Sequence, residues 1–197
     1  LFKRNLFDIN MYLSINNIKK GNYSVPHGVL YDEGVEKTTL ANSDHKNQNM
    51  SFGLSIPREW GYFGISFENN DGIYGIPYHA EEEEGHEEEE GHRVFTKVET
   101  ETYTVKGKVN TVPFFNSIDY SFRNSNSFLK EHEEDGSASL DSNSNSLAFT
   151  FNLDDQSYEK RLLLEYNHTK SPMTGAYLPS SESYDRSLAY FLRTKNK

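Results

Sequence analysis

Apolar and polar residues alternate with a period of two along much of the chain. In the first such run, apolar residues occupy the odd positions from 7 to 15, and mostly polar residues occupy the even positions between them. Strict alternation places successive side chains on opposite faces of a β-strand, whereas an amphipathic helix needs apolar spacings of three and four. We therefore expect a strand with one apolar face and one polar face.

Similar runs predict eight strands, at residues 7–16, 50–56, 62–67, 94–109, 117–126, 146–152, 157–167 and 185–194. The second and third are joined by Pro57-Arg58-Glu59-Trp60 and are expected to form a hairpin. The connections alternate between long segments (17–47, 69–93, 127–145 and 168–184) and short ones (57–60, 110–116 and 153–156). Long loops at one end and tight turns at the other are typical of an outer-membrane barrel.

The predicted fold class is therefore all-β, an antiparallel up-and-down transmembrane β-barrel. Aromatic residues at or beside the short turns fit an interfacial girdle, although ordinary packing at hairpin ends explains them equally well; they are Trp60, Tyr62, Phe114 and Phe115. Two alternatives remain open. One is a complete eight-stranded barrel that acts as a channel or adhesin, and the other is a soluble β-sandwich that binds a ligand or calcium.

Composition removes several functional classes. The formal net charge of −10 argues against a nucleic-acid partner, because such proteins carry clustered Lys and Arg. The chain has no cysteine, which excludes disulfides and thiolate metal sites. The sequence shows no nucleophile elbow, zinc-protease motif or phosphate-binding glycine loop, so we do not expect an enzyme.

Residues 79–92 read HAEEEEGHEEEEGH, with two copies of EEEEGH in tandem. A run of carboxylates without apolar residues repels itself, and a solvated low-complexity insertion is one interpretation. The other is a metal-capture segment, because imidazole with carboxylate is a usual ligand set for Zn²⁺, while carboxylates alone would suit Ca²⁺ or Mg²⁺. The candidate ligands in this segment are His79, Glu84, His86, Glu90 and His92.

Residues 60–79, WGYFGISFENNDGIYGIPYH, resemble a strand and loop entry of TonB-dependent outer-membrane receptors of the zinc-uptake type. Further similarity lies at Leu40-Ala41-Asn42-Ser43, Lys106-Gly107-Lys108-Val109-Asn110, Tyr158-Glu159-Lys160-Arg161-Leu162, Leu178-Pro179 and Ser187-Leu188-Ala189-Tyr190-Phe191. With gaps, the resemblance extends over most of the chain.

The resemblance implies that residues 1–197 are an internal piece of a barrel of about 22 strands, roughly its first third, with the plug domain and the C-terminal strands elsewhere. It implies that residues 69–93 form a long extracellular loop. Three more candidate metal ligands lie at expected strand borders: Asp71, and the pair His132 and Glu134 in a His-x-Glu arrangement.

The same resemblance implies a function and a location. The receptor would capture zinc, a related divalent metal or its chelate, and import it with energy supplied through TonB and the plug. It would lie among the lipids of the outer membrane of a Gram-negative bacterium. The metal would be cargo, and no catalytic cofactor is expected.

Overall fold

The computed structural model describes residues 2–6, 8–32, 34–77, 94–132, 137–175 and 179–194, and the regular elements in this part are all β-strands. None of the described segments forms a helix long and apolar enough to cross a membrane. Nine strands follow one another in one antiparallel sheet: β1 (Phe2–Leu6), β2 (Ile9–Lys20), β7 (His45–Arg58), β8 (Gly61–Gly75), β9 (Phe95–Val112), β10 (Phe115–His132), β11 (Ser137–Asn152), β12 (Tyr158–Ser171) and β14 (Ser181–Thr194).

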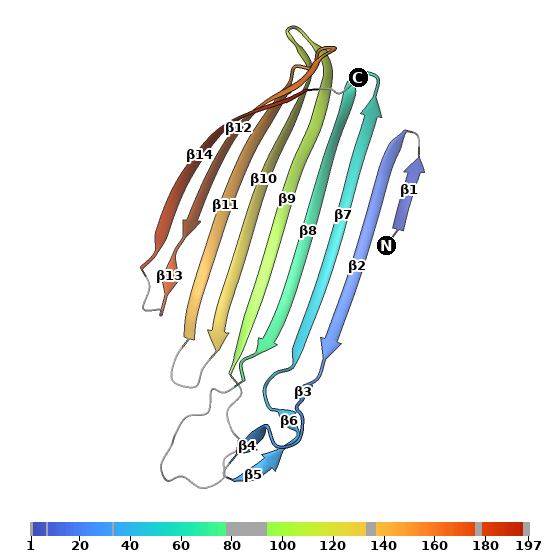
Figure 1. Ribbon diagram of the computed structural model, residues 1–197. Coiled ribbons are helices and arrows are strands. Elements are labelled where there is room, and N and C mark those ends of the chain that lie inside the picture. The colour runs from blue at the N-terminus through green and yellow to red at the C-terminus, as the bar shows by residue number, and fades with distance from the viewer. Residues whose placement is uncertain are drawn as a thin grey trace.

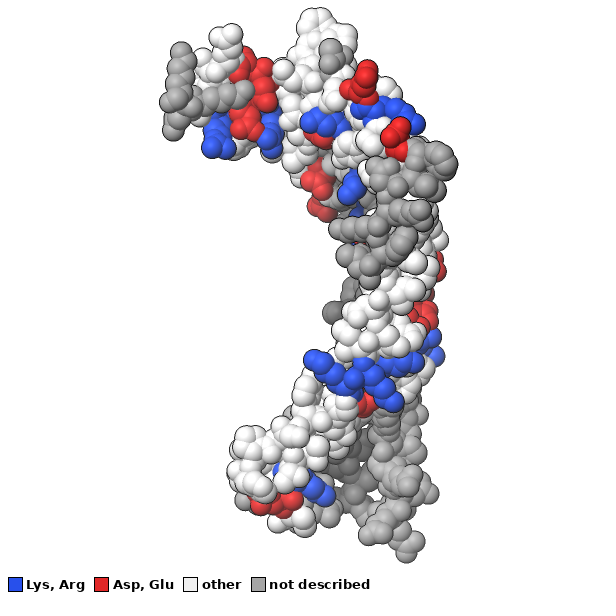
Figure 2. Space-filling view, turned by 90° about the vertical axis from the view of Figure 1, so that its right-hand side faces the viewer, with Lys and Arg blue, Asp and Glu red and all other residues white. Residues whose placement is uncertain are grey.

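Shorter strands lie at one end of this sheet. The short β13 (Met173–Thr174) pairs with β11. In the connection between β2 and β7, β3 (Tyr23–Ser24) pairs with β6 (Thr39–Leu40), and β4 (Leu30–Asp32) pairs with β5 (Val35–Lys37). The sheet is open, with β1 and β14 at its two edges (Figure 1). Seen from the β1 side it has a curved outline, and charged side chains gather toward the upper and lower parts of the view (Figure 2).

The strand register separates the two faces of the sheet. Residues directly opposite each other in neighbouring antiparallel strands share a face. One row of partners is apolar on each of the six strands from β7 to β12: Leu54, Ile65, Val105, Phe122, Leu147 and Tyr166. The adjacent row on the other face is polar or small: Ser55, Gly64, Lys106, Ser121, Ala148 and Glu165. The alternation in the sequence therefore becomes one apolar face and one polar face.

Nothing in the described part of the chain covers the apolar face. Ile65 is 44% exposed, Leu164 40% and Leu188 72%, and Val94 is the one described hydrophobic residue classed as buried. A contiguous exposed apolar face of this kind marks an interaction surface.

In the described residues, side chains pack against neighbours on adjacent strands of the sheet, and no second layer forms a buried core with them. Aromatic pairs pack across neighbouring strands, with ring centroids 5.0 Å apart for Phe67 and Tyr103. On the polar face, hydroxyl groups pair across strands, as between Thr102 and Ser125 at 3.0 Å. At the β7–β8 turn, Gly61 has φ 141°, and a Cβ there would lie 1.8 Å from the Lys108 carbonyl oxygen. The hairpin therefore needs glycine at this position.

The eight predicted strands correspond to the eight long strands of the sheet, and the predicted up-and-down order is confirmed. Their lengths differ from the prediction. Residues 127–132 and 137–145, expected in a long connection, extend β10 and β11, and β8 continues to Gly75 rather than ending before residue 69. The predicted short connection 110–116 is reduced to a turn at Pro113 and Phe114. The first strand, β1, is not among those predicted.

Candidate metal-capture site at the long-loop end

The connections β2–β7, β8–β9, β10–β11 and β12–β14 lie at one end of the sheet, at the lower end in Figure 1, and the connections β7–β8, β9–β10 and β11–β12 lie at the other. The predicted metal ligands are expected at the end with the long connections. Six of them lie outside the described residues: His79, Glu84, His86, Glu90, His92 and Glu134. The structure places the other two, Asp71 and His132, on strands.

The root of the acidic, histidine-containing segment is well defined. The Gly75 amide donates to the carbonyl oxygen of Asp44 at 2.9 Å, and the Ile76 amide donates to that of Val94 at 3.1 Å. Ile76, just after β8, and Val94, just before β9, are therefore neighbours, and the two ends of the connection between these strands lie at one place.

Asp71 lies on β8 between Gln48 of β7 and Glu99 of β9. It is on the same face as the apolar residues, but past the end of their band. Together with polar residues from neighbouring strands it lines a hollow of about 510 Å³; the polar residues there are Asn69, Asp71, Glu99, Glu101, Asn126, Ser127, Asp141, Ser142, Asn143 and Lys170.

This hollow has four carboxylates, but its charge is partly compensated. The Lys97 ammonium lies 2.5 Å from Glu99, and Lys170 lines the hollow itself. Clustered carboxylates raise the local concentration of cations, and paired lysines reduce that effect. Sequence reasoning selected Asp71 alone, because the other three acidic residues come from two other strands and are brought together only by the register.

His132 ends β10 opposite Phe95, and its ring stacks on the Phe95 ring with centroids 4.6 Å apart. The partners of Asp71 and His132 on β9, Glu99 and Phe95, are four residues apart, which corresponds to roughly 13 Å along a strand. The two candidates are therefore not brought to one point. Among the described residues, no group of three or more His, Asp or Glu could hold a metal ion.

A ring of four asparagines marks the border of the apolar band on β10 and β11. Asn124 donates to Asn145 at 2.8 Å, Asn145 to Asn143 at 2.8 Å, Asn143 to Asn126, and Asn126 to Asn124 at 3.3 Å. Each amide thus gives and receives one hydrogen bond within the ring. The next pair of residues on this face, toward the tight-turn end of the strands, is Phe122 and Leu147, where the apolar rows begin. The outward face changes there from apolar to hydrogen-bonding within one row of residues.

His168 and its neighbours form another polar contact on this face. The sequence suggested a loop position, but His168 lies within β12. Its Nε2 is 2.8 Å from Glu182 Oε1, and its ring stacks on Tyr184 with centroids 4.4 Å apart. These contacts indicate that His168 has a structural role, in the pairing of β12 with β14.

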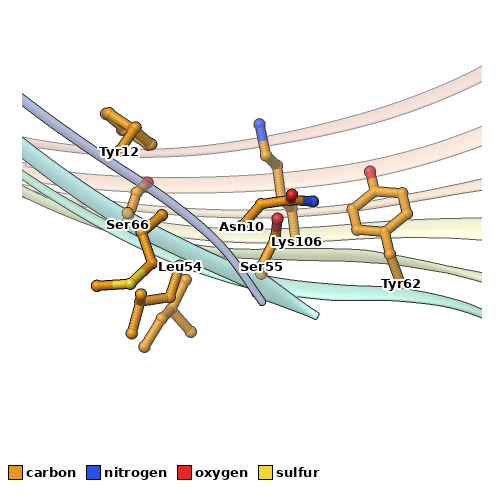
Figure 3. Close-up of a pocket in the computed structure, with 11 residues that line it drawn as sticks. Asn10, Tyr12, Leu54, Ser55, Tyr62, Ser66 and Lys106 are labelled. Carbon is orange, nitrogen blue, oxygen red and sulfur yellow. The ribbon is translucent and has the colours of Figure 1, made fainter. Parts of the chain in front are cut away.

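The polar face contains a second hollow, of about 670 Å³, between β2, β7, β8 and β9. Tyr12, Ser55, Tyr62 and Lys106 lie around it (Figure 3). Gly53 and Gly64 line the hollow and have no side chain to fill it; a Cβ on Gly53 would lie 2.1 Å from the Tyr12 ring. This hollow therefore offers hydroxyl groups and one ammonium group, and neither of the two described metal-ligand candidates, Asp71 and His132, lines it.

No known family model matches the chain, and no curated protein matches its sequence. Its structure is similar to the FrpB iron transporter from Neisseria meningitidis (F3-3 variant), with a TM-score of 0.70 over 89% of this chain and 9% sequence identity. The chain spans 29% of the length of that protein. At this identity the similarity shows the fold, which is an antiparallel, up-and-down, all-β sheet similar to part of an outer-membrane barrel.

Proposed function

We propose that this chain is part of the β-barrel of an outer-membrane receptor that captures and imports a divalent metal ion. The preferred metal is zinc, as the free ion or as its chelate. One observation carries the proposal. An up-and-down sheet with an uncovered apolar face presents its long connections, including the histidine and glutamate segment 79–92, at one end.

The apolar face supports a place in the outer membrane. Each long strand presents about three or four apolar residues in succession on this face, as at Met50, Phe52, Leu54 and Ile56 on β7. Four same-face positions span about 20 Å along a strand. This length suits the apolar band of an outer-membrane barrel, and lipid removes such a face from water without a second sheet.

The composition of the long-loop end supports metal capture. Segment 79–92 contains three histidines and eight glutamates. Four further carboxylates, on strands at the same end of the sheet, line one hollow: Asp71, Glu99, Glu101 and Asp141. Carboxylates attract cations, and imidazole nitrogen favours Zn²⁺, Ni²⁺ or Cu²⁺ over Ca²⁺. The proposed ligands are His79, Glu84, His86, Glu90 and His92. Asp71, His132 and Glu134 would serve as separate contacts at the strand borders.

Energy coupling through TonB and a plug domain rests on the sequence resemblance at residues 60–79 and on the likeness in fold to a transporter. The polar face, with its hollow between Tyr12 and Lys106, would then face the interior of the barrel.

Zinc titration tests the proposal. We expect the full chain, folded in detergent micelles, to bind Zn²⁺ more tightly than Ca²⁺ in isothermal titration calorimetry. Replacing His79, His86 and His92 together by alanine should weaken zinc binding at least tenfold, since each lost imidazole removes a ligand. The matched control replaces His27, His45 and His168 and should keep the wild-type affinity. Absence of zinc heat, or equal affinity of the two triple variants, would overturn the proposal.

A further inference from the structure

The hollow around Asp71 lies on the same side of the sheet as the apolar face and directly adjoins it. On β8 and β9 the apolar series ends at Phe67 and Tyr103, whose ring centroids are 5.0 Å apart. The next residues on this face, Asn69 and Glu101, line the hollow. Same-face residues follow one another at about 7 Å along a strand. The hollow therefore begins one residue row beyond the last apolar side chains of these two strands.

Two consecutive rows of paired residues form the hollow, toward the lower ends of β8 to β12 in Figure 1. The first row consists of Asn69, Glu101, Asn126, Asn143 and Lys170. The second row consists of Asp71, Glu99, Phe128 and Asp141. The volume of about 510 Å³ falls in the range of small-molecule sites, about 300–1,000 Å³.

Two amides of the hollow are held in fixed orientations. Asn126 and Asn143 belong to the ring of four asparagines, in which each side chain donates one hydrogen bond and accepts one. An amide has two N–H donors and an oxygen with two lone pairs. Each of these two exposed side chains therefore keeps a donor and an acceptor for a ligand. Because the ring already restricts their rotamers, binding costs little further side-chain freedom.

The chemistry of the hollow suits a neutral sugar. Carboxylates such as Glu101 and Asp141 accept hydrogen bonds from hydroxyl groups, and the amides both donate and accept. The Phe128 ring offers an apolar surface to the C–H face of a sugar ring. The four carboxylates disfavour an anion, and among the described residues no group of three His, Asp or Glu could hold a metal ion.

We propose that this hollow binds the sugar headgroup of a glycolipid whose acyl chains lie against the apolar face at Phe67 and Tyr103. The inference rests on the proposed function in one respect, which is that the apolar face meets lipid. Continuity of the two surfaces favours a membrane lipid over a free sugar, because one molecule then covers both. A lipid is also confined to the membrane, which raises its effective concentration at the hollow.

Lipid competition tests the site. The full chain is inserted into nanodiscs that contain equal amounts of phosphatidylcholine and digalactosyldiacylglycerol with the same acyl chains. Native mass spectrometry after release from the nanodiscs then counts the lipids that remain bound. We expect the glycolipid to be retained about fivefold over phosphatidylcholine, which corresponds to the net effect of a single hydrogen bond. Equal retention of the two lipids would overturn the headgroup site.

Asn143→Ala removes one of the fixed amides from the hollow and should abolish most of the preference for the glycolipid. Its matched control is Asn145→Ala, which removes the same number of hydrogen bonds from the asparagine ring but does not line the hollow. The control should keep most of the preference. Equal losses in the two variants would assign the effect to the ring and count against binding in the hollow.

Phe128→Ala removes the apolar surface of the hollow and should also weaken retention of the glycolipid. The control is Leu129→Ala, which truncates the next residue of β10 on the opposite face of the sheet. Leu129→Ala should retain the glycolipid as the unchanged protein does. Far-ultraviolet circular dichroism of all four variants shows whether any of them has lost strand content.

Two further ligands define the occupant. Phosphatidylglycerol with the same acyl chains should be retained less than the glycolipid, and its preferential retention would overturn a neutral headgroup. The free digalactosyl disaccharide should not displace the glycolipid at equal concentration. Displacement would identify a soluble sugar as the occupant and overturn the membrane lipid.

The outcomes also separate this inference from the proposed function. A chain that enters the bilayer without preferring the glycolipid overturns the headgroup site alone. A chain that does not enter the bilayer overturns both the headgroup site and the place in the membrane. Zinc titration measures metal capture and is independent of the lipid that fills the hollow.

Discussion

Asp155 shows how a single side chain organises a tight turn between β11 and β12. Its Oδ1 accepts hydrogen bonds from the amides of Ser157 at 2.8 Å and Tyr158 at 2.7 Å, and its Oδ2 lies 2.7 Å from the Lys160 ammonium. The hydrogen bond from Lys160 and the two amides lower the pKa of this carboxyl from 3.8 to about 2. All three contacts favour the ionised form.

This depressed pKa predicts a pH dependence. A carboxyl with a lower pKa in the folded state stabilises the protein above pH 3.8, and the contribution is lost as pH falls toward about 2. Asp155→Asn should therefore be less stable than the unchanged protein at neutral pH, with the difference closing over that range. Thermal unfolding in detergent at stepped pH measures it. The difference should also shrink when Lys160→Met is present in both proteins, and a difference that stays constant down to pH 2 would contradict the assignment.

At the scale of the strand, the sequence pattern predicts the part of each element that carries an apolar face. On β10, Phe122 ends the apolar series, and Asn124 and Asn126 continue on the same face. The other face, with Ser125 and Ser127, is polar as well. Alternation disappears where both faces become polar, although backbone pairing continues. The strands therefore extend past their predicted ends at the long-loop side.

Adjacent residues on β12 test which face meets lipid. Leu164 lies in the apolar row with Phe149 and Leu188, whereas Leu163 lies on the polar face opposite Thr150. Leu164→Arg should cost about 2–4 kcal/mol of folding free energy if this position is near the middle of a bilayer, because a charge is then placed in hydrocarbon. Urea titration of the chain folded into phospholipid vesicles measures this free energy.

Leu163→Arg is the matched control, since it makes the same chemical change one residue away. We expect it to cost less than about 1 kcal/mol, because the polar face can hydrate the guanidinium. Equal costs for the two substitutions would count against lipid contact at Leu164.

At the scale of the whole molecule, strand order is predictable from the sequence and the acidic hollow is not. Short turns force consecutive strands to pair, which gives the up-and-down order directly. The hollow around Asp71 instead depends on the register of each neighbouring pair of strands from β8 to β11. A slip of two residues would keep Glu99 on the same face but move it along the strand away from Asp71, and the alternation in the sequence does not exclude such a slip. Histidine spacing likewise could not show that His132 stacks on Phe95.

The open sheet makes a prediction for the chain as a whole. Leu188 is 72% exposed and Ile15 68%, at opposite sides of one continuous apolar face. Water disfavours such a surface at roughly 25 cal/mol per Å², so the chain should associate in plain buffer and become monodisperse when detergent covers the face. Sedimentation velocity with and without detergent measures the association, and far-ultraviolet circular dichroism reports the strand content. A soluble sandwich would instead bury this face under a second sheet. Monodisperse, folded protein in plain buffer would therefore favour the sandwich and rule out lipid as the partner of the apolar face.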